Sequence, residues 1–163
     1  MAAHDNFNVA ILATDGFEES ELTEPAKALG QAGGKVDVIS LHEGRIQAFK
    51  HFDKTVMVPV DLTIDQARPE QYNALMLPGG ALNADVMRAD PRVQQFIRAM
   101  AQANKPMAVI CHAPWELISA RCGARAHAHR LLHHPGRRPQ CRRKLGEPGG
   151  GGRRQSGDEP AAK

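Results

Sequence analysis

Cys111 has the clearest chemical context of any residue in this sequence. It follows a short apolar run, Met107 to Ile110, and it precedes His112 and a helix-forming segment. A strand that turns sharply into a helix through a cysteine exposes the thiol at the end of the strand, as in a nucleophile elbow. The amino-terminal dipole of the helix favours the thiolate form. His112 could act as base or stabilise the anion. The pattern therefore indicates nucleophilic chemistry at Cys111.

Two further groups follow other predicted strands. An acidic segment, residues 15–21, comes after the first strand and ends in Glu21, while Gly79 and Gly80 come after the fourth strand. Because the carboxyl ends of parallel strands open on one crevice, we expect both groups near Cys111. The backbone N–H groups of two glycines can closely approach a developing oxyanion. An acidic side chain beside the thiol could hydrogen-bond with it or orient the histidine.

Each of these groups also has a purely structural interpretation. A cysteine after an apolar strand is usually an inert core thiol. The glutamates between positions 18 and 24 could form no more than the acidic start of a helix. Gly79 and Gly80 could form an ordinary turn at the end of a strand. Phe17 and Trp115 could line the crevice, but core packing is the favoured role for both.

The elements that must position these residues follow from apolar patterns in residues 1–120. Strands are predicted at Asn8–Thr14, Lys35–Leu41, Thr55–Val60, Ala74–Leu77 and Met107–Ile110. Helices are predicted at Glu21–Gly33, where Pro25 implies a late start or a kink, from Pro91 after an Asp90 cap, and at Ala113–Ala120. The helix after Asp90 carries one apolar stripe, Val93, Phe96, Ile97 and Met100. Strands alternating with helices predict an α/β fold whose mostly parallel sheet is covered on both faces.

The net charge of +3 over 163 residues has two unlike sources. Residues 1–120 hold 10 Lys and Arg against 15 Asp and Glu, a net of −5, whereas residues 121–163 hold 11 against 3, a net of +8. The second segment contains no Ile, Val, Met, Phe, Tyr or Trp, but eight Gly and four Pro. Such a segment cannot bury enough apolar area to offset the entropy of ordering it. We therefore expect one α/β domain in residues 1–120 and a disordered tail in residues 121–163.

The composition also excludes several classes of protein. Three cysteines are too few for a disulfide scaffold, and no run of eighteen apolar residues could span a membrane. The first residues lack the apolar stretch of a signal peptide, so we expect a cytoplasmic location, with no membrane partner. The cysteines and histidines of the tail match no zinc-binding spacing, and we expect neither a metal nor another cofactor. Because the excess positive charge lies in the tail alone, a nucleic-acid partner is not expected either.

Four segments together resemble the superfamily of the PfpI intracellular protease and the Parkinsonism-associated deglycase. They read ILATDGFEESEL, VPVDLTID, ALMLPGGALNADVMR and PMAVICHAPWELISA. The resemblance covers roughly residues 7–120. It implies a flavodoxin-like three-layer α/β sandwich related to class I glutamine amidotransferases. It also implies that the carboxyl-terminal part of that fold is missing from this chain.

The resemblance assigns roles residue by residue. Cys111 matches the nucleophilic and oxidisable cysteine, His112 the histidine of the PfpI-type subgroup, and Glu21 the glutamate that hydrogen-bonds the cysteine. Gly79 and Gly80 match the oxyanion glycines. Asp85 aligns, across a one-residue gap, with an acid that PfpI-type enzymes receive from a neighbouring subunit, and homo-oligomers are expected from the resemblance.

Three functions follow from these assignments. The first is a cysteine-dependent hydrolase linked to stress response, which would act as an intracellular protease or amidase, or as a glyoxalase or deglycase on carbonyl compounds. The second is a non-enzymatic redox sensor or chaperone that works through oxidation of Cys111 to the sulfinic acid. The third is an inactive product of a frameshift. A small carbonyl compound or a peptide is the expected substrate of the first.

The frameshift hypothesis makes a prediction about the gene. When residues 121–162 are translated back to all possible codons and read one base later, the permitted strings include TIQDD, NAG, WVNQEVVVDG and VTSR in that order, as in the carboxyl-terminal part of the superfamily. These strings are hypothetical and are not in this chain. Sequencing of the DNA around codon 121 should show codons that spell them, and codons that cannot do so would disprove the frameshift. The chain as written should then be less stable and more prone to aggregate than a complete family member.

Overall fold

A computed structural model describes residues 7–122 of the chain. The prediction of a disordered, out-of-frame tail concerns residues that lie outside this range, apart from Arg121 and Cys122. The described strands are β1 Asn8–Leu12, β2 Phe17–Glu18, β3 Lys35–Ser40, β4 Arg45–Lys50, β5 Asp53–Pro59, β6 Leu62–Thr63, β7 Ala74–Leu77 and β8 Met107–Val109. The helices are α1 Glu19–Gln31, the short 3₁₀ helix η1 Pro69–Gln71, α2 Ala81–Ala89, α3 Pro91–Gln102 and α4 Pro114–Ser119.

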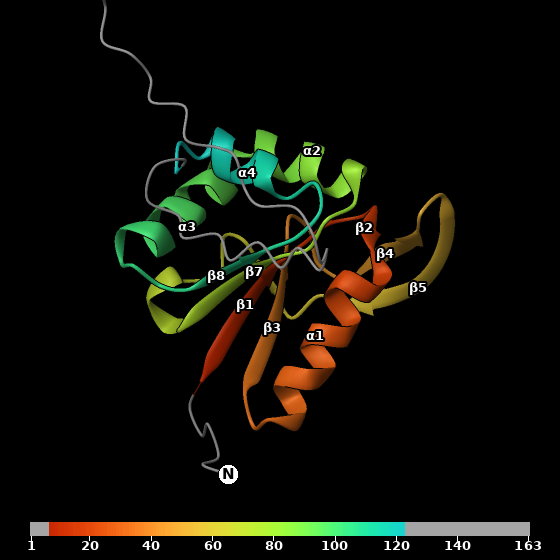
Figure 1. Ribbon diagram of the computed structural model, residues 1–163, viewed down its shortest axis with the longest axis horizontal. Coiled ribbons are helices and arrows are strands. Elements are labelled where there is room, and N and C mark those ends of the chain that lie inside the picture. The colour runs from red at the N-terminus through yellow and green to blue at the C-terminus, as the bar shows by residue number, and fades with distance from the viewer. Residues whose placement is uncertain (1–6, 123–163) are drawn as a thin grey trace, which may run out of the picture. The chain divides into compact units, whose positions relative to one another are not determined.

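Five strands form a parallel sheet with the order β6-β3-β1-β7-β8 (Figure 1). The chain leaves β1 toward β3 on one side and later returns to β7 on the other side. Strand order therefore reverses at β1, and ligands of open α/β sheets bind beside the carboxyl ends of the strands at such a reversal. The sheet and its flanking helices confirm the predicted flavodoxin-like α/β fold.

Strand β1 separates two apolar cores because its side chains alternate between the faces of the sheet. Ala10 and Leu12 lie in one core together with the stripe of α3, and Val9 and Ile11 lie in the other together with Leu22 of α1. Helix α1 accordingly lies on one side of the sheet, and α2, α3 and α4 lie on the other (Figure 1). This three-layer arrangement is what a strand that is apolar on both faces requires.

The start and the buried face of α3 are confirmed. The Asp90 side chain accepts a hydrogen bond from the Arg92 backbone N–H at 2.8 Å, and Pro91 is the first helical residue. The four residues of the predicted stripe are all buried, namely Val93, Phe96, Ile97 and Met100. Cap and stripe are both local patterns, so the sequence alone was sufficient to predict them.

Other elements differ from expectation. The predicted strand Thr55–Val60 is not in the main sheet: β5 pairs antiparallel with β4, in a separate sheet of order β2-β4-β5. Helix α1 begins at Glu19, before the predicted start, and continues through Pro25. Leu22 packs this helix into the core on its side of the sheet, and Pro25 lacks one backbone donor of the helix. Helix α2 was not predicted at all.

Strand β8 is outermost on its side of the sheet among the described residues, and Ala108 within it is exposed. Within residues 7–122, no further strand pairs with this edge. The expected loss of stability from a missing carboxyl-terminal part therefore stays a prediction. None of the helices within this range has the length and apolar character needed to cross a bilayer.

Glu116 is an acid in the core. Its side chain is completely inaccessible to solvent, and neither carboxyl oxygen has a hydrogen-bond partner among the described residues. Burial raises the pKa of Glu116 from its ordinary 4.5 to about 9. The folded protein therefore holds this carboxyl in its neutral form at pH 7, because a bare carboxylate there would be strongly destabilised.

The stability of the fold should consequently fall as pH rises from about 4.5 to 9. Below this window the folded and the unfolded chain both hold the proton, whereas within it only the folded chain does. Glu116→Gln removes this difference in proton binding between the folded and the unfolded chain. It should raise the free energy of unfolding at pH 8 by on the order of 3 kcal/mol, with little effect at pH 4.5. Urea denaturation at both pH values measures this. Glu24→Gln, at an exposed position of α1, is the matched control, and an equal effect of Glu116→Gln at both pH values would contradict the prediction.

Candidate active site

Cys111 lies at a sharp turn that leaves its thiol exposed. The pairing of β8 with β7 continues to Ile110, whose N–H donates to the Leu77 carbonyl at 3.1 Å. Cys111 itself has a φ of +56°, a left-handed conformation that costs a non-glycine residue on the order of 1 kcal/mol. The strained turn directs the side chain out of the sheet and into solvent. The elbow geometry expected at this position is therefore present.

The helix after Cys111 is weaker than expected. Helix α4 has only six residues, and its first residue, Pro114, carries no backbone N–H. A short helix that begins with proline offers few free N–H groups to a thiolate. The helix therefore presents fewer backbone donors beside the sulfur than the elbow pattern implies.

Gly79 brings the carboxyl of Glu21 and the thiol of Cys111 together. The Gly79 N–H donates to Glu21 Oε2 at 2.7 Å. A Cβ atom at position 79 would lie 2.5 Å from both the Cys111 Cβ and Glu21 Oε2, and 3.2 Å from the Cys111 sulfur. Because no real Cβ atom is tolerated at 2.5 Å, this position needs glycine for space. The absent side chain is what allows acid and thiol to share one site.

The Glu21 carboxyl is half-buried, and burial is the main reason why its pKa is raised above the ordinary value. The negative charge of Glu18 raises the pKa further, whereas the Gly79 N–H and the Cys111 side chain oppose the rise. A larger share of Glu21 is therefore protonated near neutral pH than of a carboxyl in water. Such a group can donate a proton as well as accept a hydrogen bond.

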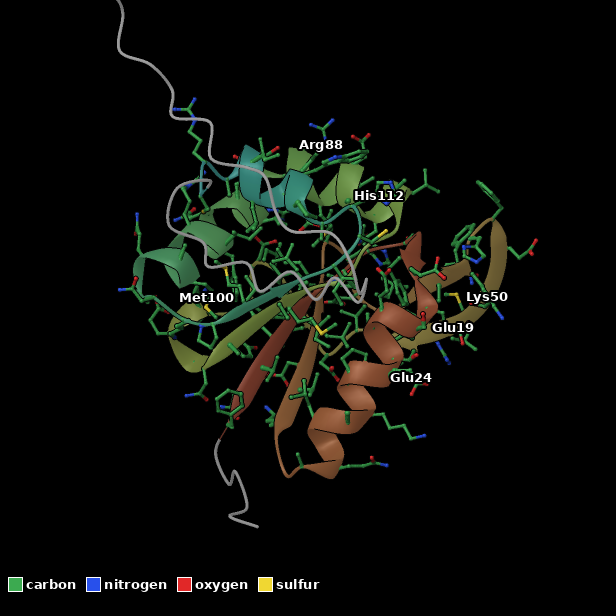
Figure 2. All side chains as sticks on the ribbon, in the orientation of Figure 1. Glu19, Glu24, Lys50, Arg88, Met100 and His112 are labelled. Atoms are coloured by element: carbon green, nitrogen blue, oxygen red, sulfur yellow. The ribbon has the colours of Figure 1, made fainter. Side chains whose placement is uncertain are left out.

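His112 lies against the thiol, as expected for a residue that assists it. The distance between its Nδ1 and the Cys111 sulfur is 3.1 Å. On its other side, the imidazole meets the Trp115 ring edge to face, with centroids 5.1 Å apart. Trp115 thus holds the histidine ring beside the sulfur. Arg88 and His112 lie at the same end of the molecule in Figure 2, close to α2 and α4.

The sequence favoured core packing for Trp115, the aromatic residue that contacts His112. Trp115 is 42% exposed, so the interpretation as a core residue is wrong, because α4 packs through Leu117 and leaves the indole at the rim of the site. Phe17 is completely buried, as expected. Arg88 covers the indole from above, with its guanidinium carbon 5.8 Å from the ring centroid.

Asp85 is not brought into contact with the thiol. Its exposed carboxylate pairs with Arg88 one turn further along α2, at 2.7 Å. Among the described residues, the contacts that link it to the site are those of Arg88 with Asp85 and with Trp115. Its assignment as an acid that acts on a neighbouring subunit stays a prediction.

The two glycines of the expected oxyanion site are not equivalent. The Gly79 N–H is already bonded to Glu21, so it is not available to a substrate while that bond exists. The Gly80 N–H has no acceptor within residues 7–122. Gly80 has a φ of +92°, and a side chain there would overlap the carbonyl oxygen of Gly16. Gly80 is therefore the better candidate donor.

The side chain that secures this loop is Asn83, which sequence reasoning missed. It is completely buried, and its Nδ2 donates to the carbonyls of Pro78 at 3.0 Å and Gly79 at 3.2 Å. Its Oδ1 accepts from the Thr14 N–H at 2.7 Å. An amide three residues after a glycine pair gives no signal by itself, because its partner Thr14 is 69 residues away. Within residues 7–122, no group of three or more His, Cys, Asp or Glu side chains could hold a metal ion.

The chain is similar in sequence to several curated proteins. General stress protein 18 of Bacillus subtilis is 41% identical over 113 residues, which are 69% of this chain and 64% of that protein. Protein/nucleic acid deglycase 2 of Escherichia coli is 39% identical over 112 residues, or 69% and 63%. Deglycase PfpI of Pyrococcus furiosus is 38% identical over 112 residues, or 69% and 64%. The chain thus spans somewhat less than two thirds of the length of these relatives.

Solved structures show the same fold. A two-domain protein of Anabaena variabilis with DJ-1/ThiJ/PfpI-like and ferritin-like domains has a TM-score of 0.65 and 29% identity, and the match covers 70% of this chain and 32% of that one. DJ-1beta of Drosophila melanogaster also has a TM-score of 0.65, at 24% identity, with 71% and 61% covered. The model of the DJ-1/PfpI family matches residues 7–135. The chain therefore belongs to the DJ-1/PfpI family.

Proposed function

We propose that the protein is a cysteine-dependent enzyme that processes carbonyl compounds. The observation that carries this proposal is the exposed thiol of Cys111 on a left-handed turn, with the Glu21 carboxyl and the His112 imidazole both beside it. A thiol placed between a base and a proton donor is arranged for addition to an electrophilic carbon. An inert core thiol would be buried, as Cys122 is.

The first chemical step follows from these positions. His112 Nδ1 accepts the thiol proton, and the sulfur forms a bond with the carbonyl carbon. The π electrons of the C=O bond move to its oxygen, which becomes an oxyanion. The Gly80 N–H stabilises this oxyanion, and the protonated form of Glu21 supplies the proton that neutralises it. For a 2-oxoaldehyde, a hydrogen then moves from the carbinol carbon to the neighbouring carbonyl carbon, which gives a thioester. Water adds to the thioester carbonyl and the C–S bond breaks, which releases the hydroxy acid and restores the thiol.

The substrate class is inferred from relatives. Two of those described above are named deglycases, which supports a small 2-oxoaldehyde, or its adduct on a side chain, as the substrate. Peptide hydrolysis would use the same addition step and remains the competing activity. For methylglyoxal, addition of one water molecule and an internal shift of hydrogen would give lactate.

A redox role is the second candidate, and a specific feature favours it. The exposed Cys111 thiol is open to peroxide, and the neighbouring Glu21 could hydrogen-bond the oxidised sulfur. Two molecules of hydrogen peroxide would convert the thiolate into a sulfinate and release two molecules of water. The relative in Bacillus subtilis is named a stress protein, which fits a sensor as well as an enzyme.

We also propose that the protein forms a homo-oligomer. The support is the exposed Asp85–Arg88 pair beside Trp115, where an acid from a second subunit could reach His112. This assignment would make the oligomer part of the active site.

Replacement of the nucleophile tests the proposed function. Cys111→Ser should reduce methylglyoxal consumption, or peptide cleavage if that is the activity, by at least about a hundredfold, because the hydroxyl is a far weaker nucleophile. Both reactions are measured with the full chain. Cys122→Ser, which alters a buried thiol away from the site, is the matched control and should retain full activity.

The outcomes separate the two candidates. If wild-type protein turns over neither substrate and mild peroxide adds two oxygen atoms to Cys111 in the intact mass, the redox role replaces the enzymatic one. If Cys111→Ser retains turnover, the nucleophile has been assigned wrongly.

Gly79→Ala should impair the reaction and should also lower the thermal stability, because the new Cβ overlaps the Cys111 Cβ. The new Cβ must displace the Cys111 side chain or the Glu21 carboxyl, and misplacement of a reacting group by about 1 Å can reduce turnover on the order of a hundredfold. Gly30→Ala is the matched control, because a Cβ atom at this position of α1 meets nothing within 4 Å. Turnover and thermal unfolding of both variants check this, and wild-type turnover in Gly79→Ala would contradict it.

A further inference from the structure

The peptide unit between Gly79 and Gly80 is held from its carbonyl side. We propose that Asn83 is a positioning residue that fixes this unit so that the Gly80 N–H faces the reacting oxygen. The inference deepens the proposed function and rests on it. It gives a reason for a buried amide that no step of the chemistry touches directly.

Three hydrogen bonds determine the orientation of the Asn83 amide. Its Nδ2 donates to two carbonyls, those of Pro78 and Gly79, and its Oδ1 accepts from the Thr14 N–H. Carbonyls only accept and a backbone N–H only donates, so the amide cannot be turned around without loss of all three bonds. Thr14 directly follows the central strand β1 and its flanking residue Ala13. The glycine loop is thereby tied to the most buried strand of the sheet.

A second donor acts on the same carbonyl. The Glu18 N–H donates to the Gly79 oxygen at 3.3 Å. The C=O and N–H of a trans peptide point in opposite directions. Because Asn83 and Glu18 hold the carbonyl on their side, the Gly80 N–H must point away from them. It has no acceptor within the part of the chain that the structure describes.

The neighbouring residue places this free N–H close to the thiol. A Cβ atom on Gly79 would be 3.2 Å from the Cys111 sulfur, so the loop touches the nucleophile at position 79. The N–H of position 80, one residue further on, can reach an oxygen on a carbon bonded to that sulfur. Asn83 thus acts on the oxyanion through Gly80, and not by contact with the substrate.

Two reactions of the same thiol test the inference. Addition to methylglyoxal develops an oxyanion, whereas alkylation by iodoacetamide forms an S–C bond, expels iodide and develops none. Asn83→Asp retains an oxygen for Thr14 but replaces the Nδ2 donor with an acceptor. We expect kcat for methylglyoxal to fall ten- to a hundredfold, with KM within about threefold and the rate of Cys111 alkylation within about twofold of wild type.

Tyr72→Phe is the structural control, because it removes a buried hydrogen bond, the 3.0 Å contact with Asp37, at the opposite end of β7 from the glycine loop. It should leave the ratio of the two rates unchanged. If Asn83→Asp fails to fold, Asn83→Ala gives the same comparison and leaves helix α2 a good helix former. A folded variant in which both reactions fall by the same factor, or neither falls, would overturn the inference. Failure of the proposed function is a separate result, since wild-type protein would then turn over no carbonyl substrate.

Discussion

The hydrogen bond from the Gly79 N–H to the Glu21 carboxyl is the interaction on which the site depends. It joins the first turn of α1 to the loop after β7, two segments 58 residues apart. It occurs beside Cys111, at the edge where the order of the parallel strands reverses. The bond also explains why the two glycines differ as hydrogen-bond donors. The Gly79 N–H is engaged by Glu21, whereas the Gly80 N–H is available. The backbone of the glycine loop therefore positions the Glu21 carboxyl, the Cys111 thiol and the Gly80 N–H together.

Local patterns were sufficient to predict much of the fold. The apolar runs identified the strands β1, β3, β7 and β8 within a residue or two, and an aspartate before a proline identified the start of α3. These signals depend on neighbours in the chain. The strand–cysteine–helix pattern likewise predicted an exposed thiol at the end of β8. His112 and Glu21 lie beside that thiol, and their roles there stay predictions.

The remaining features depend on contacts distant in sequence. Nothing around Thr55–Val60 indicates that it pairs antiparallel with β4 in place of joining the main sheet. The role of Asn83 depends on Thr14 and on the glycine loop meeting at one point, and the exposure of Trp115 depends on how α2 and α4 pack. A pattern of residue types predicts a face or a turn, but which segments finally meet there is decided by the packing of the whole sheet.

The reactive centre and its rim are made from different parts of the chain. The spacing of thiol and carboxyl is defined at Gly79, by its backbone N–H and by its lack of a side chain, which no substitution elsewhere can replace. The rim consists of exposed side chains, Trp115 and Arg88, held to each other by a ring contact. Selection can therefore exchange the rim without disturbing the spacing at the centre. Reactivity and recognition can evolve separately on this scaffold, and a library aimed at altered recognition should vary the exposed rim positions Arg88 and Trp115 and leave Asn83 and the glycine loop intact.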